Sequence, residues 1–189
     1  MTRLALLDGP ATAGVRDQLV AVYRAAMGAA PFHETEVETA GSPRSWPGRS
    51  PSPASAAGRP TTTTASWPAS PTGLPTPEIP AEGWYGSLRE AVGPDAAERW
   101  LTGQFAVVWI AVRPDRRGRG IGRELLGRLL AGAGSDRAWL VTHDLDTPAR
   151  ALYRSLGFRH LGHGPLGWHD ADRVVLGAEL GGAPPDGGS

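Results

Sequence analysis

The chain has 189 residues and no net charge, because its 19 basic residues, all of them arginines, balance 19 acidic ones. This balance excludes a general electrostatic attraction to nucleic acids or membranes, and the absence of cysteine excludes disulfides, a thiolate nucleophile and a cysteine metal site. The length suits one domain with a sizeable core. The first residues hold too short an apolar run for a signal peptide, and no run approaches a membrane span, so we predict a cytoplasmic protein with no membrane partner.

The first 40 residues predict a strand, a helix and the start of a second helix. Residues 3–7 are a short apolar run that is ended by an Asp-Gly-Pro turn. Residues 15–27 have the pattern of an amphipathic helix. Its apolar face comprises Val15, Leu19, Val22, Tyr23 and Ala26. Residues 34–39 then begin what we predict to be a second helix.

Residues 41–80 are unlike the rest of the chain. They are crowded with Pro, Ser, Thr and Ala and have almost no periodic apolar pattern, so their composition predicts a disordered insert or linker. A second interpretation is that residues 41–72 are translated out of frame, because globular sequence resumes abruptly at Gly83. Reading each new codon from the third base of the preceding one turns residues 61–73 into an acidic turn followed by an apolar strand.

Beyond Gly83 the elements are regular. Residues 88–100 predict a short helix or a helix pair divided at Gly93-Pro94. Residues 105–112 are an apolar run ended by Pro114, as expected of a buried strand.

A turn rich in glycine and arginine joins this strand to the next helix. It reads Arg-Gly-Arg-Gly-Ile-Gly over residues 117–122. Such a turn leaves several N–H groups pointing the same way, and the helix dipole behind them favours an anion. Glycine also lets the backbone approach a phosphate closely. The alternative is an arginine-rich surface turn before an ordinary helix. The apolar face of that helix comprises Ile121, Leu125, Leu126, Leu129 and Leu130.

The glycine spacing distinguishes between kinds of phosphate site. A P-loop needs a lysine, which the chain lacks, and a dinucleotide fingerprint spaces its glycines differently. The pattern R-x-x-G-x-G at Arg117, Gly120 and Gly122 resembles the acyl-CoA pyrophosphate loop of the GNAT family of N-acetyltransferases. The Ile-Ala-Val-Arg-Pro run before the turn and the Gly-Arg-Glu-Leu-Leu run after it are similar to that family too.

A second signature follows another predicted strand at residues 138–142. Thr147 suits a helix N-cap, Pro148 the first helical position and Gly157 the C-terminal cap. The helix between them has Ala149, Leu152, Tyr153 and Leu156 on its inner side, and its A-x-x-L-Y-x-x-x-G-F pattern resembles the second GNAT signature. The last predicted strands are residues 158–161 and 173–180, and residues 181–189 are a predicted disordered tail.

The resemblance implies an α/β (α+β) fold over residues 1–180, with a mixed central sheet flanked by helices. In that fold the second and third strands belong within residues 41–80. The low-complexity composition there therefore predicts that these two strands are lost or disordered.

The family binds acetyl-CoA as a co-substrate in a V-shaped opening between two central parallel strands, with no metal. The resemblance implies that the pantetheine arm contacts backbone groups of Ile110, Ala111 and Val112. It implies that the pyrophosphate is held by N–H groups of Arg117, Gly118, Arg119, Gly120, Ile121 and Gly122. The family often has Asn near position 146, but Asp146 is a carboxylate that repels phosphate, so this contact is not carried over.

Catalysis requires a neutral amine and stabilisation of the departing thiolate. Tyr153 occupies the family position for the second task, and a phenol is a suitable proton donor; the alternative is a core aromatic. Some family members have a general-base Glu on the central strand, but residues 104–112 contain no carboxylate. His143 and Asp144 follow the next strand and could act through water, and a relay of ordered water is an equal alternative.

Other polar residues have weaker claims. In the family, the link between the first two helices helps to line the acceptor site, so His33, Glu34 and Glu36 are candidate acceptor contacts, although a solvated acidic helix start explains them as well. Three histidines lie in a Gly-rich segment rather than on one helix face, so we assign them no metal. They are His160, His163 and His169.

The resulting prediction is an N-acetyltransferase that uses acetyl-CoA and a primary amine of a small molecule or peptide. The alternative is a catalytically silent acyl-CoA-binding domain. Neutral charge and the lack of interleaved aromatics argue against nucleic-acid binding through the arginine turn. The sequence does not identify the acceptor, and it leaves open whether the protein forms a homodimer.

Overall fold

A computed structural model describes residues 3–7, 16–30, 32, 54–59, 69–76, 82–164 and 172–181. The chain forms two compact units. The first comprises residues 1–74 and 108–132, and the second comprises residues 75–107 and 133–189. Strand β4 (Gln104–Val112) contributes its first half to the second unit and its second half to the first.

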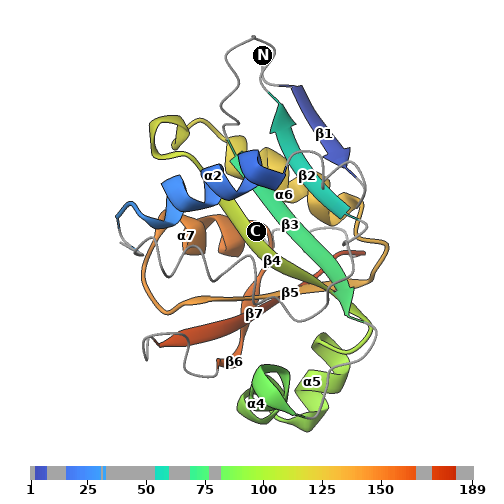
Figure 1. The fold of residues 1–189 in the computed structure, drawn as a ribbon. Helices are drawn as coiled ribbons and strands as arrows, with labels where there is room; N and C mark the ends of the chain where they lie inside the picture. The colour runs from blue at the N-terminus through green and yellow to red at the C-terminus, as the bar shows by residue number, and fades with distance from the viewer. Residues whose placement is uncertain are drawn as a thin grey trace, which may run out of the picture. The chain divides into compact units, whose positions relative to one another are not determined.

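The first unit combines an antiparallel three-stranded segment with two helices (Figure 1). Its elements are β1 (Arg3–Leu7), α2 (Arg16–Met27), β2 (Ala54–Arg59), β3 (Ala69–Thr76) as far as residue 74, and α6 (Ile121–Ala131). Helices α2 and α6 lie on opposite faces of these strands (Figure 1). Helix α6 buries Leu125, Leu126 and Leu129 completely, which confirms the predicted apolar face at these three residues, whereas Ile121 and Leu130 are half-buried.

The prediction that residues 41–80 lack the second and third strands is wrong. Strand β2 pairs with β1 along the whole of β1, from Arg3↔Arg59 to Leu7↔Ser55. It pairs with β3 through Ala54↔Gly73 and Ser55↔Thr72. A small-residue sequence such as Ala-Ser-Ala-Ala-Gly-Arg carries little strand signal of its own. Its extended backbone still needs only neighbouring N–H and C=O groups to pair with, and strand preference depends mainly on such context. The hypothesis that residues 41–72 are translated out of frame assumed that these two strands are missing, and the structure contradicts that assumption.

The second unit contains the remaining elements. Its strand order is β4-β5-β7-β6. Strand β4 is parallel to β5 at Phe105↔Ala138 and Ala106↔Trp139, whereas β5–β7 and β7–β6 are antiparallel. The elements are α4 (Gly83–Val92), α5 (Pro94–Trp100), β5 (Arg137–His143), α7 (Pro148–Ser155), β6 (Arg159–His163) and β7 (Arg173–Glu179).

The predicted elements of this unit are confirmed. The helix pair is divided at Gly93, whose φ of 86° ends one helix before Pro94 starts the next. The strands predicted around residues 138–142, 158–161 and 173–180 correspond to β5, β6 and β7, with small shifts at their ends.

Thr76 fixes the end of β3 within the second unit. Its side-chain oxygen lies 2.8 Å from the Leu101 carbonyl and 2.6 Å from the Gln104 carbonyl, and it accepts a hydrogen bond from Trp139 Nε1 at 3.3 Å. Thr76 is only 4% exposed. A residue in the segment predicted to be disordered is therefore a buried polar junction.

Thr76→Val is expected to lower the free energy of unfolding by about 1–3 kcal/mol, because the indole N–H and two carbonyls lose a buried partner while the side-chain volume is kept. Urea unfolding measures this change. Thr76→Ser retains the hydroxyl and serves as the control. Equal stability of the Val variant and the wild-type protein would contradict the role of this junction.

Some predictions fall outside the described residues. These are the helix start at 34–39 and the tail beyond residue 181. Within the described part of the chain, the helices are too short and polar to cross a membrane.

Candidate functional site

The turn between β4 and α6 is built by two glycines in the left-handed region. After β4 the chain makes a short 3-10 turn, η1 (Pro114–Arg116), and then passes through Gly118 with φ 73° and Gly120 with φ 76°. Residues with a Cβ rarely adopt such values. The space where a Cβ would stand is open at both glycines. The backbone is thus exposed on a side where a ligand could approach it.

This turn presents backbone N–H donors at the start of α6. The Glu124 N–H bonds to the Gly120 carbonyl at 3.1 Å, closing the first helical turn. Gly120 is the N-cap and offers no side-chain acceptor. Across the described residues, no group accepts a hydrogen bond from the N–H groups of Gly118, Gly120, Ile121 and Gly122. Unpaired donors and the helix dipole together favour an anion here.

Arg117 differs from the other predicted donors. Its backbone N–H bonds to the Pro114 carbonyl at 3.3 Å. Its guanidinium bonds to the carbonyls of Ala26 and Ala30, both at 3.0 Å. The structure thus gives the Arg117 donors internal acceptors, a role that the motif spacing did not indicate.

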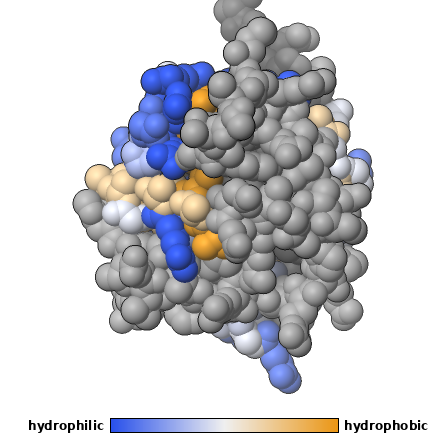
Figure 2. All heavy atoms as spheres, turned by 45° about the horizontal axis from the view of Figure 1, so that its top comes forward, coloured by the Kyte–Doolittle hydropathy of each residue, from blue (hydrophilic) through white to orange (hydrophobic). Residues whose placement is uncertain are grey.

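The surface around the turn is strongly hydrophilic. Figure 2 shows hydrophilic side chains gathered on the face that carries the β4–α6 turn. Asp115 pairs with Arg113 at 3.1 Å and with Arg116 at 3.3 Å. The hydrogen bond from Arg113 is the main cause that lowers the pKa of Asp115 below its usual value. Arginines outnumber carboxylates in this turn, which adds to its preference for anions.

The predicted pantetheine contacts form the end of β4. Ile110 and Val112 are partly exposed, and Ala111 is buried at 2% exposure. Just before them, the Trp109 ring meets the Tyr23 ring of α2 edge-on, with centroids 5.1 Å apart. This contact anchors α2 to the strand that leads into the turn.

In the second unit, helix α7 is defined by its two caps. The Thr147 hydroxyl accepts a hydrogen bond from the Arg150 N–H at 3.2 Å. At the other end Gly157 has φ 83°, its N–H bonds to the Arg154 carbonyl at 3.1 Å, and the Phe158 N–H bonds to the Tyr153 carbonyl at 3.0 Å. This pair of bonds is a Schellman motif. The predicted caps are therefore confirmed.

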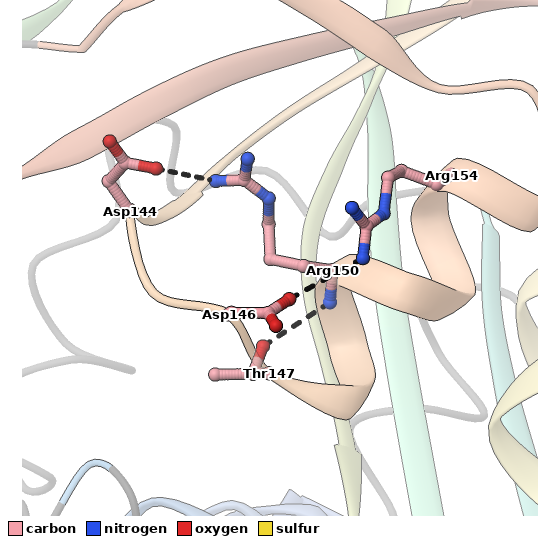
Figure 3. A network of polar contacts seen from close by, with 5 residues as sticks. All are labelled: Asp144, Asp146, Thr147, Arg150 and Arg154. Carbon is pink, nitrogen blue, oxygen red and sulfur yellow. Dashed lines mark hydrogen bonds and ion pairs between the residues drawn. The ribbon is translucent and has the colours of Figure 1, made fainter.

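Two ion pairs tie the β5–α7 loop to the helix (Figure 3). Arg150 bonds to Asp144 at 3.0 Å, and Arg154 bonds to Asp146 at 3.4 Å. Arg150 thus engages the carboxylate of Asp144, which makes Asp144 a weaker candidate for the general base than His143. These pairs span six and eight residues, spacings that no helical rule points to.

Tyr153 is buried on the inner face of α7. It is 6% exposed, and its ring lies 5.9 Å from the Phe158 ring, centroid to centroid. Burial raises the pKa of Tyr153 to about 12. The phenol therefore stays protonated at neutral pH and can act as a hydrogen-bond donor.

His143 ends β5 opposite Arg173 of β7. Burial, followed by the charge of Arg173, lowers the pKa of His143 below its ordinary value of 6.5. The imidazole is therefore neutral near pH 7 and able to accept a proton.

His143→Gln is expected to reduce the loss of stability on acidification. Because the folded-state pKa lies below 6.5, the unfolded chain binds a proton more readily. The stability contribution is present above about pH 6.5 and is lost as the pH falls through the folded-state pKa. Melting temperatures at about pH 7.5 and about pH 5 test this: the wild-type Tm should fall further than that of the variant. If the Tm falls equally in the wild-type protein and in the variant, groups other than His143 cause the loss of stability in acid.

The remaining candidates separate into two groups. The rings of His160 and His163 on β6 are 5.3 Å apart, centroid to centroid. In the described ranges no group of three or more His, Cys, Asp or Glu side chains could hold a metal ion. His33, Glu34, Glu36 and His169 lie outside the described residues.

Comparison with known proteins identifies related sequences. The family model described as the acetyltransferase (GNAT) domain matches residues 87–160. An uncharacterized protein of Mycobacterium leprae is 48% identical over 62 residues, which cover 33% of this chain and 17% of that protein. A mycothiol acetyltransferase of Clavibacter sepedonicus is 42% identical over 90 residues, covering 42% of this chain and 30% of that protein. The chain thus spans less than a third of each of these relatives.

A solved structure shares the fold. The ribosomal-protein-S18-alanine N-acetyltransferase from Escherichia coli aligns with a TM-score of 0.57 over 98% of both chains, at 20% sequence identity. This likeness confirms the mixed α/β architecture that the two sequence signatures predict.

Proposed function

We propose that the chain is a GNAT acetyltransferase that transfers an acetyl group from acetyl-CoA to a primary amine. The match of residues 87–160 to the acetyltransferase (GNAT) domain and the mycothiol acetyltransferase relative support this proposal. The observation that carries the proposal is the β4–α6 turn, which offers unpaired backbone N–H groups at a helix N-terminus. A pyrophosphate matches these donors in charge and in hydrogen-bonding character.

The residues of the turn fit the phosphate end of CoA. The backbone N–H groups of Gly118, Arg119, Gly120, Ile121 and Gly122 would donate the hydrogen bonds. The absence of a Cβ at the glycines Gly118 and Gly120 leaves room for close approach. The Arg117 side chain would not bond to phosphate. It would contribute through the hydrogen bonds from its guanidinium to the carbonyls of Ala26 and Ala30 at the end of α2. Ile110, Ala111 and Val112 would offer strand backbone groups to the pantetheine arm.

Acetyl-CoA supplies the activated acetyl group. The amine must lose a proton as its nitrogen bonds to the acetyl carbon, and the bond from that carbon to sulfur breaks. His143, neutral near pH 7, would accept the proton through water. Tyr153 would donate a hydrogen bond to the departing sulfur. Its pKa of about 12 lies well above the value of about 8.5 for a thiol, so complete proton transfer from Tyr153 is unfavourable and hydrogen bonding is its proposed role.

A thiol-release assay with acetyl-CoA and a panel of amines tests the activity. The panel contains aminoglycoside, polyamine and peptide N-terminal amines, together with the acceptor of mycothiol acetyltransferases, because two relatives carry that name. Amine-dependent thiol release supports the proposal. CoA binding without thiol release on any acceptor would favour the catalytically silent binding domain. The lack of a carboxylate in residues 104–112 is the sequence feature that supports this alternative. A cytoplasmic location remains part of the proposal.

A further inference from the structure

We infer that Arg117 is a positioning residue that couples the β4–α6 turn to the C-terminal end of helix α2, so that CoA bound at the turn stabilises that end. The inference rests on the proposed function, because it takes CoA as the ligand of the turn. All the groups that carry it lie in the first unit.

The guanidinium of Arg117 acts as a cap for α2. Its two terminal nitrogens bond to the carbonyls of Ala26 and Ala30, each at 3.0 Å. Helix α2 ends at Met27, so the Ala26 carbonyl belongs to the last turn, where carbonyls lack a donor within the helix. A cation at this end is also favoured by the helix dipole. One side chain thus satisfies two carbonyls on either side of the helix terminus.

The backbone of Arg117 belongs to the turn itself. Its N–H bonds to Pro114, and the next residue, Gly118, begins the left-handed stretch that presents the donors. An anion that holds the donors therefore also fixes the Cα of Arg117. The guanidinium then loses less conformational entropy when it bonds to α2, so the two events stabilise each other.

The body of α2 has its own support. Val22 and Ala26 are buried at 1% and 3% exposure, and Tyr23 packs on Trp109. Removal of the guanidinium therefore leaves the helix packed and loosens only its end. The amides that report on this end are those of Gly28, bonded to the Arg24 carbonyl at 2.9 Å, and Phe32, bonded to the Ala29 carbonyl at 3.1 Å.

Hydrogen exchange with and without saturating CoA tests the coupling in the full chain. In the wild-type protein, CoA should slow exchange in residues 118–122 and, by about fivefold or more, at Gly28 and Phe32. Arg117→Ala should keep the protection at the turn and lose the protection at the end of α2. Arg117→Lys, with a single cationic head, should restore part of it.

Arg116→Ala is the matched control, since the ion pair of Arg116 with a described residue is the one to the adjacent exposed Asp115. This variant should behave like the wild-type protein. Protection of Gly28 and Phe32 that persists in Arg117→Ala would overturn the inference, as would protection at the wild-type turn with none at α2. A wild-type turn that CoA leaves unprotected overturns the proposed function, and the inference with it.

Discussion

Gly120→Glu is expected to abolish CoA binding, with a rise in Kd on the order of 100-fold or more. Gly120 has φ 76°, so a Cβ costs about 1–2 kcal/mol and shifts the turn away from the conformation that presents its donors. The new side chain would enter open space beside the turn. Its carboxylate would bond to the N–H groups of α6 itself and would repel the pyrophosphate.

Isothermal titration with CoA measures the effect, and a thermal melt checks the fold. Gly134→Glu is the matched control, because Gly134 also has a positive φ, 62°, and open space around it, but lies outside the turn. It should bind CoA as the wild-type protein does. A folded Gly120→Glu variant with unchanged affinity would refute the assignment of the turn to CoA.

Tyr153→Phe is expected to lower kcat by about 10- to 100-fold while the acetyl-CoA KM changes by less than about threefold. The hydroxyl would stabilise charge on sulfur that develops only as the thioester bond breaks, and such a contact affects kcat rather than ground-state binding. The ring of Phe keeps the packing against Phe158. Steady-state kinetics with an acceptor from the panel, together with a melting curve, provide the measurement.

Tyr85→Phe is the control for loss of a phenol in the same unit. Tyr85 lies on α4, and burial raises its pKa as well, so the control removes a comparable group that has no proposed role. Its kcat should match that of the wild-type protein. If Tyr153→Phe turns over at the wild-type rate, Tyr153 is a packing residue and the leaving group is stabilised elsewhere.

The sequence alone determined the elements whose causes are local. Helix α7 is specified by Thr147 and Gly157, because a hydroxyl cap and a left-handed glycine act on the backbone within a few residues. The β4–α6 turn is equally local, since Gly118 and Gly120 set its conformation directly. Both predictions needed no knowledge of distant contacts, and the family resemblance rested on them.

Tertiary structure decided what has no local signal. Strand β2 is extended because β1, some 50 residues away in sequence, supplies its pairing groups from Arg3↔Arg59 onward. The composition of β2, read alone, predicted disorder. In the same way, Thr76 became a buried junction because its partners Leu101, Gln104 and Trp139 surround it.

For Arg117, the sequence determined one part of its role and the tertiary structure the other. Its place in the motif was evident from spacing, but its guanidinium bonds to carbonyls 91 and 87 residues earlier in the chain, at Ala26 and Ala30. Backbone carbonyls have no sequence signature, since every residue carries one. Only the approach of the end of α2 to the turn determines which of them the long arginine side chain can reach.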